Sequence, residues 1–372
     1  MSTTETKTVL KGGEFLIKES DSATIFTPEQ LNEEQRMFAQ TTADFINTRV
    51  LPNLQKIDKQ EPGLSVKLLE ETAELGLLGA SVPEEFGGMG IDVATDTAIN
   101  EEIGKGHSFA ASYAAHTGIG TLPILYFGTE EQKQKYLPGL VNGTLKAAYC
   151  LTEPGSGSDA LGAKSKAVLS EDDKYYVLNG QKMWITNGGF ADIFTVFAKI
   201  DGDKFTGFIV DAKSEGLSLG SEEDKLGIKG SSTRQVFFND VKVPAENVLG
   251  EIGKGHKIAF NVLNIGRYKL CVLALGGSKA ATTTAVKYAN ERIQFNVPIS
   301  SFGAIKHKLA EMAIKVYACE SATYRTAGLI DEKIAELVAG GMDKVQAKLV
   351  AAEEYSIECA ILKVYGSEVL DY

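Results

Sequence analysis

The densest group of residues able to do chemistry runs from Tyr149 to Asp159 and reads Tyr-Cys-Leu-Thr-Glu-Pro-Gly-Ser-Gly-Ser-Asp. Small residues, hydroxyls and exposed backbone amides in such a loop can wrap a polar cofactor at close range. Gly155, Gly157 and Ala160 also satisfy the dinucleotide pattern G-x-G-x-x-A. That pattern requires a helix directly after it, whereas Lys164 to Ser170 predicts a strand. We therefore reject a nicotinamide site, and an ordinary solvated turn remains the competing interpretation.

A second candidate is Trp184-Ile185-Thr186, a strand end that carries the only tryptophan and is followed by an asparagine and two glycines. An indole ring there can form a wall against a planar cofactor ring, and the Thr186 hydroxyl can donate to a ring nitrogen. A tryptophan buried in an ordinary core is the alternative explanation.

Two arginines lie near opposite ends of the next predicted helix. Arg267 lies early in it, and Arg292 lies near its far end, before Ile293-Gln294-Phe295. A guanidinium group makes paired hydrogen bonds that suit a pyrophosphate. Solvated surface cations are the alternative, and a cation near the end of a helix also suits the helix dipole.

The cysteines and histidines form no recognised metal pattern. Cys150, Cys271, Cys319 and Cys359 are widely spaced without a C-x-x-C pair, which predicts buried reduced thiols in a cytosolic protein. The four histidines are scattered and form no H-E-x-x-H, so no metal site is expected.

Composition narrows the class of protein. A chain of 372 residues with 44% hydrophobic and 23% charged residues is typical of folded soluble proteins with two or three cores. The net charge of -11 disfavours nucleic acid as the main partner. No apolar run approaches the roughly eighteen residues of a membrane span, so no transmembrane segment is expected. Residues 1–12 are polar and lack the apolar centre of a signal peptide.

The hydrophobic period changes twice along the chain. We predict an N-terminal arm (1–26), a helical domain (27–146), a β domain (147–250) and a second helical domain (251–372). This order argues against a doubly wound α/β fold, in which strands and helices alternate throughout.

Local signals predict individual elements. Helix starts are expected at Thr27 to Gln30 and at Thr129 to Gln132, by capping-box logic. A helix from Ser65 should turn Leu68, Leu69, Thr72 and Leu75 inward and stop at Gly76, and glycine-rich turns are expected at Gly87-Gly88 and Gly118 to Gly120.

Turn residues predict β hairpins across Asn179-Gly180 and across Asp201-Gly202. Val236 to Phe238 and Val241 to Val243 predict further strands. Gly340-Gly341 predicts a helix break, and one final helix from about Val345 reaches Tyr372 without a capping device, so it looks cut.

Together these segments resemble the acyl-CoA dehydrogenase family over nearly the whole chain. Tyr149 to Ser158 and Trp184 to Thr186 resemble its two flavin-contacting stretches. Other similar segments are Gly79 to Gly88, Lys225 to Arg234, Phe238 to Pro244, and Arg292 to Phe295 followed by Phe302-Gly303. Lys11 to Ile17 resembles the very-long-chain branch, whose members carry an additional C-terminal domain.

The resemblance implies an α+β fold: an N-terminal helical domain, a middle β-barrel or sandwich domain and a C-terminal helical bundle, here incomplete. It implies FAD as cofactor. The implied FAD-binding residues are Tyr149, Cys150, Leu151, Thr152, Glu153, Pro154, Gly155, Ser156, Gly157, Ser158, Trp184, Ile185, Thr186, Arg292, Gln294, Phe295, Phe302 and Gly303. The implied substrate-binding residues are Ser158, Asn264, Ile265, Gly266 and Arg267.

The resemblance also implies a reaction: α,β-dehydrogenation of a fatty acyl-CoA to a trans-2-enoyl-CoA in fatty acid β-oxidation. A carboxylate removes the proton beside the thioester, hydride passes to the flavin, and electrons leave to an electron-transfer flavoprotein. Arg292 and Gln294 should reach the flavin of a neighbouring subunit, so a homodimer or homotetramer is expected. The implied location is cytoplasmic, or peripheral at a membrane surface, and chain-length preference is not readable.

The expected catalytic base is missing from both family positions. Most members carry it after the helix that here reaches Tyr372, and a minority carry it at the position of Gly266, which has no carboxylate. We therefore expect the base beyond Tyr372, and this polypeptide to be nearly inactive. Two alternatives stay open: a related acyl-CoA oxidase or flavin monooxygenase, and a non-catalytic member acting in binding or assembly.

Overall fold

The computed structural model describes residues 9–372. The chain folds into two compact units. The helical unit contains the described residues up to Gln40, Asp92–Lys105 and Arg267–Tyr372, and the mixed unit contains Thr41–Ile91 and Gly106–Gly266. Part of the expected arm, residues 1–8, lies outside the described residues, and the division into one arm and three domains stays a prediction.

Short helices lead into the sheet of the mixed unit. They are α2 (Leu54–Asp58), α3 (Leu64–Glu74), α5 (Ser108–Ala114), α6 (Leu122–Phe127), α7 (Glu130–Val141) and the π-helix η8 (Ala115–Gly120). The expected start of α7 is confirmed, because the Gln132 amide donates to the Thr129 hydroxyl and the Thr129 amide donates to the Gln132 side chain.

Two expectations for these helices are wrong. Leu68, Leu69 and Thr72 are buried as expected, but Leu75 is 40% exposed, because α3 ends at Glu74 and the helical period stops there. The expected turn at Gly118 to Gly120 is part of η8. A Cβ atom at Gly120 would lie 2.9 Å from the Ala147 side chain, so this glycine permits close packing and makes no turn.

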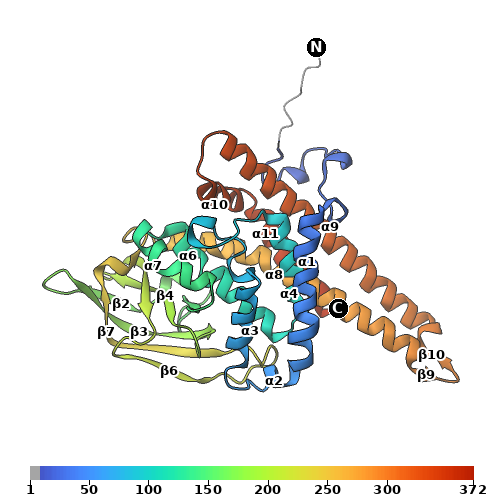
Figure 1. The fold of residues 1–372 in the computed structure, drawn as a ribbon, viewed down its shortest axis with the longest axis horizontal. Helices are drawn as coiled ribbons and strands as arrows, with labels where there is room; N and C mark the ends of the chain where they lie inside the picture. The colour runs from blue at the N-terminus through green and yellow to red at the C-terminus, as the bar shows by residue number, and fades with distance from the viewer. Residues whose placement is uncertain (1–8) are drawn as a thin grey trace, which may run out of the picture. The chain divides into compact units, whose positions relative to one another are not determined.

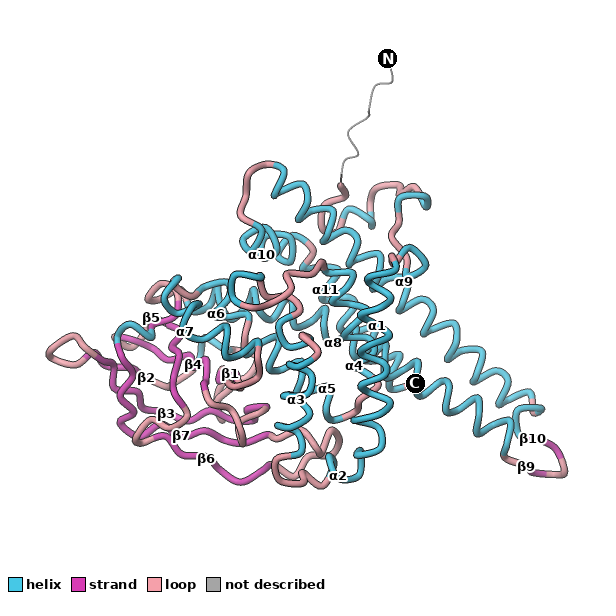
Figure 2. The backbone as a smooth tube through the Cα atoms, viewed as in Figure 1, coloured by secondary structure: helices cyan, strands magenta, loops and turns pink. Residues whose placement is uncertain are grey.

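The mixed unit contains one eight-stranded sheet, drawn in magenta in Figure 2. Its strands are β1 (Ala147–Cys150), β2 (Lys166–Leu169), β3 (Tyr175–Thr186), β4 (Ile193–Ile200), β5 (Lys204–Asp211), β6 (Leu217–Glu222), β7 (Thr233–Pro244) and β8 (Val248–Leu249). The strand order is β6-β7-β3-β2-β4-β5-β8, and β1 pairs with β4. Strands β1 and β2 run parallel to β4, and the other pairs are antiparallel.

The Asp201-Gly202 hairpin is confirmed: both residues have positive φ, 52° and 86°, and β4 pairs with β5. The Asn179-Gly180 hairpin is wrong, because both residues lie inside the continuous strand β3, which pairs with β7. A Cβ atom at Gly180 would lie 2.2 Å from the Ser165 hydroxyl oxygen. This glycine therefore permits a close approach between strands.

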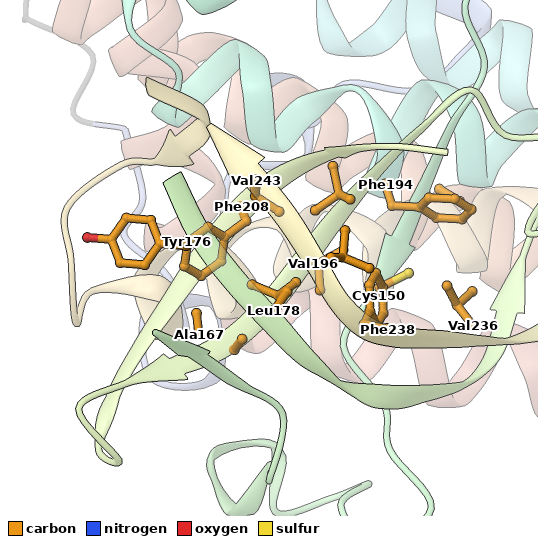
Figure 3. Close-up of a cluster of buried hydrophobic side chains, with 14 of the residues drawn as sticks. Cys150, Ala167, Tyr176, Leu178, Phe194, Val196, Phe208, Val236, Phe238 and Val243 are labelled. Carbon is orange, nitrogen blue, oxygen red and sulfur yellow. The ribbon is translucent and has the colours of Figure 1, made fainter. Parts of the chain in front are cut away.

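The sheet curls around one hydrophobic core (Figure 3). Side chains from strands that are not hydrogen-bonded neighbours meet there; the Tyr176 ring on β3 and the Phe208 ring on β5 are 5.4 Å apart in an edge contact. Cys150, Phe194 and Val196 are fully buried in the same cluster. Alternate residues of β3 and β7 face it, which explains the period of two in the sequence.

The helical unit is built from α4 (Val93–Gly104), α9 (Gly303–Ala339), α10 (Lys344–Glu354) and α11 (Ser356–Asp371), together with α8 (Gly255–Glu291) from Arg267 onward and the start of α1 (Glu33–Phe45). Tyr268 and Cys271 of α8 share a core with Cys319 and Tyr324 of α9. Figure 1 shows these two helices running together to the small hairpin of β9 (Ile293–Gln294) and β10 (Val297–Pro298).

Two helix predictions in this unit need correction. The capping box at Thr27 starts only a 3-10 turn, Pro28–Gln30, whereas α1 begins at Glu33 after a reciprocal cap between Asn32 and Gln35. The expected break at Gly340-Gly341 is confirmed. The single final helix is two helices, because the chain bends at Tyr355, whose buried ring donates its hydroxyl to the Leu10 carbonyl at 2.6 Å.

The expected fold class is confirmed: helices, then a β domain, then helices. By length and composition alone, α8 passes a test for a membrane-crossing helix, and 44% of its most apolar stretch is buried inside the protein. Core helices of soluble proteins pass the same test.

Candidate cofactor site

The structure brings the two candidate flavin segments together in the mixed unit. Strand β1 ends at Cys150, and the loop that follows runs beside the end of β3. The Met183 amide of β3 donates to the Thr152 carbonyl at 2.9 Å. Thr152 belongs to one predicted segment, and Trp184, next to Met183, belongs to the other.

Trp184 is exposed, so its interpretation as an ordinary core residue is wrong. The side chain is 59% accessible, although Ile185 beside it is buried at 2%. The pairing of β3 with β7 shifts register between Lys182 and Ile185, and Trp184 has φ of +58°. A bulky residue in the left-handed region is a strained outlier, and such residues cluster at functional sites.

The loop after β1 combines anchored and open residues. Pro154, Gly155, Gly157 and Ser158 are exposed, and a Cβ atom at either glycine would have no neighbour within 4 Å in the described part of the chain. After this loop comes only a 3-10 turn, Ala160–Gly162, and then β2, so the rejection of a nicotinamide fingerprint holds.

Other predicted residues face inward. Cys150 and Ile185 lie in the β core, and the Glu153 carboxylate accepts hydrogen bonds from two backbone amides and from Lys182. The Ser156 hydroxyl donates to the Asp159 carbonyl at 2.6 Å. We infer that these four residues support the site, and that ligand contacts fall to their exposed neighbours.

Several hydroxyls remain available for a ligand. Within residues 9–372, the side chains of Thr152, Ser158 and Thr186 make no hydrogen bond. The Tyr149 hydroxyl is buried without a partner in the same part of the chain. Polar groups of this kind, beside an exposed aromatic ring, fit a flat ligand with polar edges.

Sequence reasoning missed several residues that hold these segments. Lys182 is fully buried and forms an ion pair with Glu153 at 2.7 Å. Asn187 has φ of +64°, and its side-chain amide donates to the Ser112 carbonyl at 2.9 Å. The signals available in the sequence were a lysine at an apolar-strand position and an asparagine after Thr186.

His116 was also missed. Its Nε2 lies 2.9 Å from the Leu140 carbonyl, and its Nδ1 accepts from the Ala147 amide at 3.2 Å, which defines the neutral ring with the proton on Nε2. Burial lowers the pKa of His116 from its ordinary 6.5 to about 4. The neutral imidazole therefore joins the end of α7 to the start of β1.

The predicted substrate residues Asn264, Ile265 and Gly266 are consecutive and half-buried on α8. Among residues 9–372, a Cβ atom at Gly266 would have one neighbour within 4 Å, the Ile119 side chain at 3.9 Å. The backbone at this position therefore has room for a Cβ atom, although it carries none. Arg267 belongs to the helical unit and is half-buried there.

The predicted pyrophosphate segment forms the β9–β10 hairpin of the helical unit. Arg292 and Gln294 are exposed, and Phe295 is 87% exposed with its ring 6.1 Å from that of Phe302. The Arg292 side chain forms no hydrogen bond or ion pair with the described part of the chain. Gly303 begins α9 directly after Phe302. This segment is therefore available to an external ligand.

All four cysteines are unpaired and buried, as expected. Among the described residues, no group of three or more histidine, cysteine, aspartate or glutamate side chains is placed to hold a metal ion.

Family models match most of the chain. The acyl-CoA dehydrogenase N-terminal domain matches residues 32–144, the middle domain 148–241 and the C-terminal domain 253–370. The chain belongs to the acyl-CoA dehydrogenase family. The resemblance drawn from the sequence motifs is thus confirmed.

Individual relatives agree with this membership. A probable acyl-CoA dehydrogenase of Bacillus subtilis is 52% identical over 364 residues, which cover 98% of this chain and 61% of the relative. The very long-chain specific acyl-CoA dehydrogenase of Macaca fascicularis is 40% identical, over 92% of this chain and 51% of the relative. The chain therefore spans about half to three fifths of the length of these relatives.

A solved structure matches closely. The acyl-CoA dehydrogenase of Bacillus anthracis complexed with FAD has a TM-score of 0.95 and 53% identity, covering 98% of this chain and 62% of that chain. At this similarity the backbone arrangement described here is that of the family.

Proposed function

We propose that this chain binds FAD between the loop after β1 and the end of β3 and serves the α,β-dehydrogenation of fatty acyl-CoA. The observation that carries the proposal is Trp184: an exposed indole on a strained backbone, at the edge of a loop with unbonded hydroxyls. Bound FAD would supply the acceptor for the hydride equivalent removed from the substrate.

Each exposed residue has a role suited to its chemistry. The Trp184 ring covers one face of a planar group, and the hydroxyls of Thr152 and Thr186 donate to its polar edge. Ser158 and residues 264–267 contact the acyl-CoA. Arg292 and Gln294 hold a pyrophosphate of a second subunit, because a guanidinium pairs with phosphate oxygens.

The full reaction needs a carboxylate base, for which the chain has none at Gly266. The residue that supplies this base stays a prediction. The very long-chain relatives favour a long acyl substrate, with electrons passing to an electron-transfer flavoprotein. We further propose that the protein is a homodimer or homotetramer in the cytoplasm.

The proposal is tested by titrating FAD into purified protein. We expect a structured flavin absorption band and quenching of the emission of Trp184, the only tryptophan. W184F should bind FAD more weakly than wild type, and T186V should shift the flavin spectrum because a donor to the ring is lost. A protein that binds no FAD contradicts the proposal.

The reaction class needs a separate measurement. Addition of palmitoyl-CoA under argon should shift the flavin band through binding, with little bleaching because position 266 carries no base, and oxygen should not be consumed when air is admitted. Rapid oxygen consumption with peroxide release would instead indicate an oxidase or monooxygenase.

A further inference from the structure

Lys182 of β3 and Glu153 of the loop after β1 form an ion pair inside the mixed unit. Lys182 is 0% exposed and Glu153 is 6% exposed, and their nitrogen and oxygen atoms are 2.7 Å apart. Burying two charges is costly, and apolar residues of similar volume often serve stability equally well. Stability alone therefore does not explain why this pair is buried.

The Glu153 carboxylate closes the base of the exposed loop. One oxygen accepts from the Lys164 amide at 2.6 Å, and the other accepts from the Ser165 amide at 3.0 Å and from Lys182. Glu153 and Ser156 also exchange backbone hydrogen bonds of 2.9 and 3.1 Å. The two ends of the segment 154–163 are thus fastened to one carboxylate.

The Lys182 ammonium fastens the same carboxylate to β3. It also donates to the Leu151 carbonyl at 3.2 Å. Between these two contacts, the Thr152 carbonyl accepts from the Met183 amide. Three consecutive loop residues, 151–153, are therefore bonded to two consecutive strand residues, 182 and 183.

Trp184 follows directly, at the bulge in β3. Its exposed ring and positive φ depend on the strand being held on both sides of the bulge. On the C-terminal side, the Asn187 amide donates to the Ser232 carbonyl at 2.9 Å. On the N-terminal side, the anchor is Lys182.

Each charge of the pair opposes the effect of burial on the pKa of its partner. Burial alone would raise the pKa of Glu153, but Lys182 and the donated hydrogen bonds outweigh it, so this pKa lies below its usual range. Burial lowers the pKa of Lys182, and the charge of Glu153 opposes that shift.

We propose that the Lys182–Glu153 ion pair is a positioning device that holds the loop 151–158 and Trp184 at the separation required to bind one ligand between them. This inference rests on the proposed function for the identity of that ligand, FAD. Neither residue touches the ligand through its charged group, because each is enclosed by protein. They affect ligand binding by fixing the positions of Thr152 and Trp184.

The experiment uses Trp184 as a reporter, because it is the only tryptophan. The variants are E153Q, K182M and the apolar pair E153L/K182M. The matched control is K204M, which breaks an exposed ion pair of 2.8 Å with Asp201 in the β4–β5 hairpin of the same unit. For each protein we would measure thermal midpoint, tryptophan anisotropy and acrylamide quenching without FAD, and the FAD dissociation constant.

A purely stabilising pair and a positioning pair give different results. The apolar pair should restore most of the thermal midpoint lost in the single variants. Positioning predicts that it nevertheless lowers the anisotropy of Trp184, raises acrylamide quenching about twofold and weakens FAD binding about tenfold. K204M should match wild type throughout.

A folded E153L/K182M protein with wild-type anisotropy and wild-type FAD affinity would overturn the inference. Should E153L/K182M not fold, E153Q decides, because it keeps the side-chain volume and one acceptor oxygen while removing the charge. If wild type binds no FAD, the proposed function fails, yet the anisotropy of the FAD-free proteins still decides whether the pair positions Trp184.

Discussion

Buried polar side chains decide how the first strand of the sheet joins the helices before it. His116 bonds to both the Leu140 carbonyl and the Ala147 amide, and it must be neutral to accept from the latter. The strand it holds leads, within a few residues, to Thr152. A single titratable ring therefore contributes to the geometry of the candidate site.

His116 should make stability depend on pH. Its pKa falls from 6.5 to about 4 on folding, so the unfolded chain binds the proton more readily. The contribution of neutral His116 to the free energy of unfolding is complete above pH 6.5 and is lost as pH falls through about 4. The loss amounts to about 3 kcal/mol. Chemical unfolding at intervals between pH 7 and pH 4 would measure it.

The control for that measurement is H116Q, which keeps a donor and an acceptor without titrating. Other groups also titrate in this range; burial raises the pKa of Asp331 to about 6. The prediction therefore concerns the difference between wild type and H116Q, which should change by the stated amount. Parallel curves for the two proteins would contradict the assignment.

Gly266 should accept a carboxylate side chain. The position lies inside α8, and of the side chains that the structure describes, a Cβ atom there would meet only that of Ile119, at 3.9 Å. Replacing an internal helix glycine by a residue with better helix propensity stabilises by about 0.5–1 kcal/mol. We expect G266E to unfold at or above the wild-type temperature, and a marked fall in melting temperature would show that the space is not there.

Between elements, helices α4 and α8 of the helical unit cross at very close range. A Cβ atom at Gly276 would lie 1.9 Å from the Glu101 carbonyl oxygen and 3.2 Å from the Gly104 Cα. Beside the crossing, Lys279 donates to Glu101 at 2.5 Å, and the Tyr324 hydroxyl donates to the same carboxylate at 3.1 Å. These hydrogen bonds depend on the contact that the two glycines permit.

G276A should therefore destabilise the protein, by about 1–3 kcal/mol, because the backbone of α4 must move away. The neighbouring G277A is the matched control: its Cβ atom would meet the flexible Leu370 side chain at 3.3 Å. G277A should not lower the free energy of unfolding, since alanine is a better helix former than glycine. Equal denaturant midpoints for the two variants would refute the close crossing.

Binding of FAD should raise the free energy of unfolding of the whole molecule. A ligand that binds only the folded protein stabilises it by about 2.7 kcal/mol at a concentration one hundred times its dissociation constant. We expect the melting temperature to rise with added FAD and to stay unchanged with NAD, for which the chain lacks the helix after the glycine loop. Stabilisation by NAD instead would point to another cofactor.

Two sequence signals with a local mechanism predicted their elements correctly. The Asp201-Gly202 hairpin depends on two residues that tolerate positive φ, and the start of α7 depends on a reciprocal bond between residues three apart. The motif from Tyr149 to Ser158 together with Trp184 to Thr186 likewise identified the family. The order helices, sheet, helices followed from the change in hydrophobic period.

Other features were decided by residues distant in the chain. Gly180 looked like a turn residue, but it is a glycine because Ser165 lies against it. Thr27 carries a capping signal, yet the helix begins where Asn32 and Gln35 cap each other. In both cases the residue has the local preference that was assumed. A contact elsewhere in the structure determined which element formed there.

The sequence by itself determined the family, the succession of secondary structure and the two segments of the candidate site, because those depend on short-range patterns. Only the tertiary structure decided that Trp184 is exposed and that Lys182 pairs with Glu153, 29 residues away. A charge can remain buried only where a partner charge and donors surround it. Such surroundings arise when the strands pack, and no window of the sequence contains them.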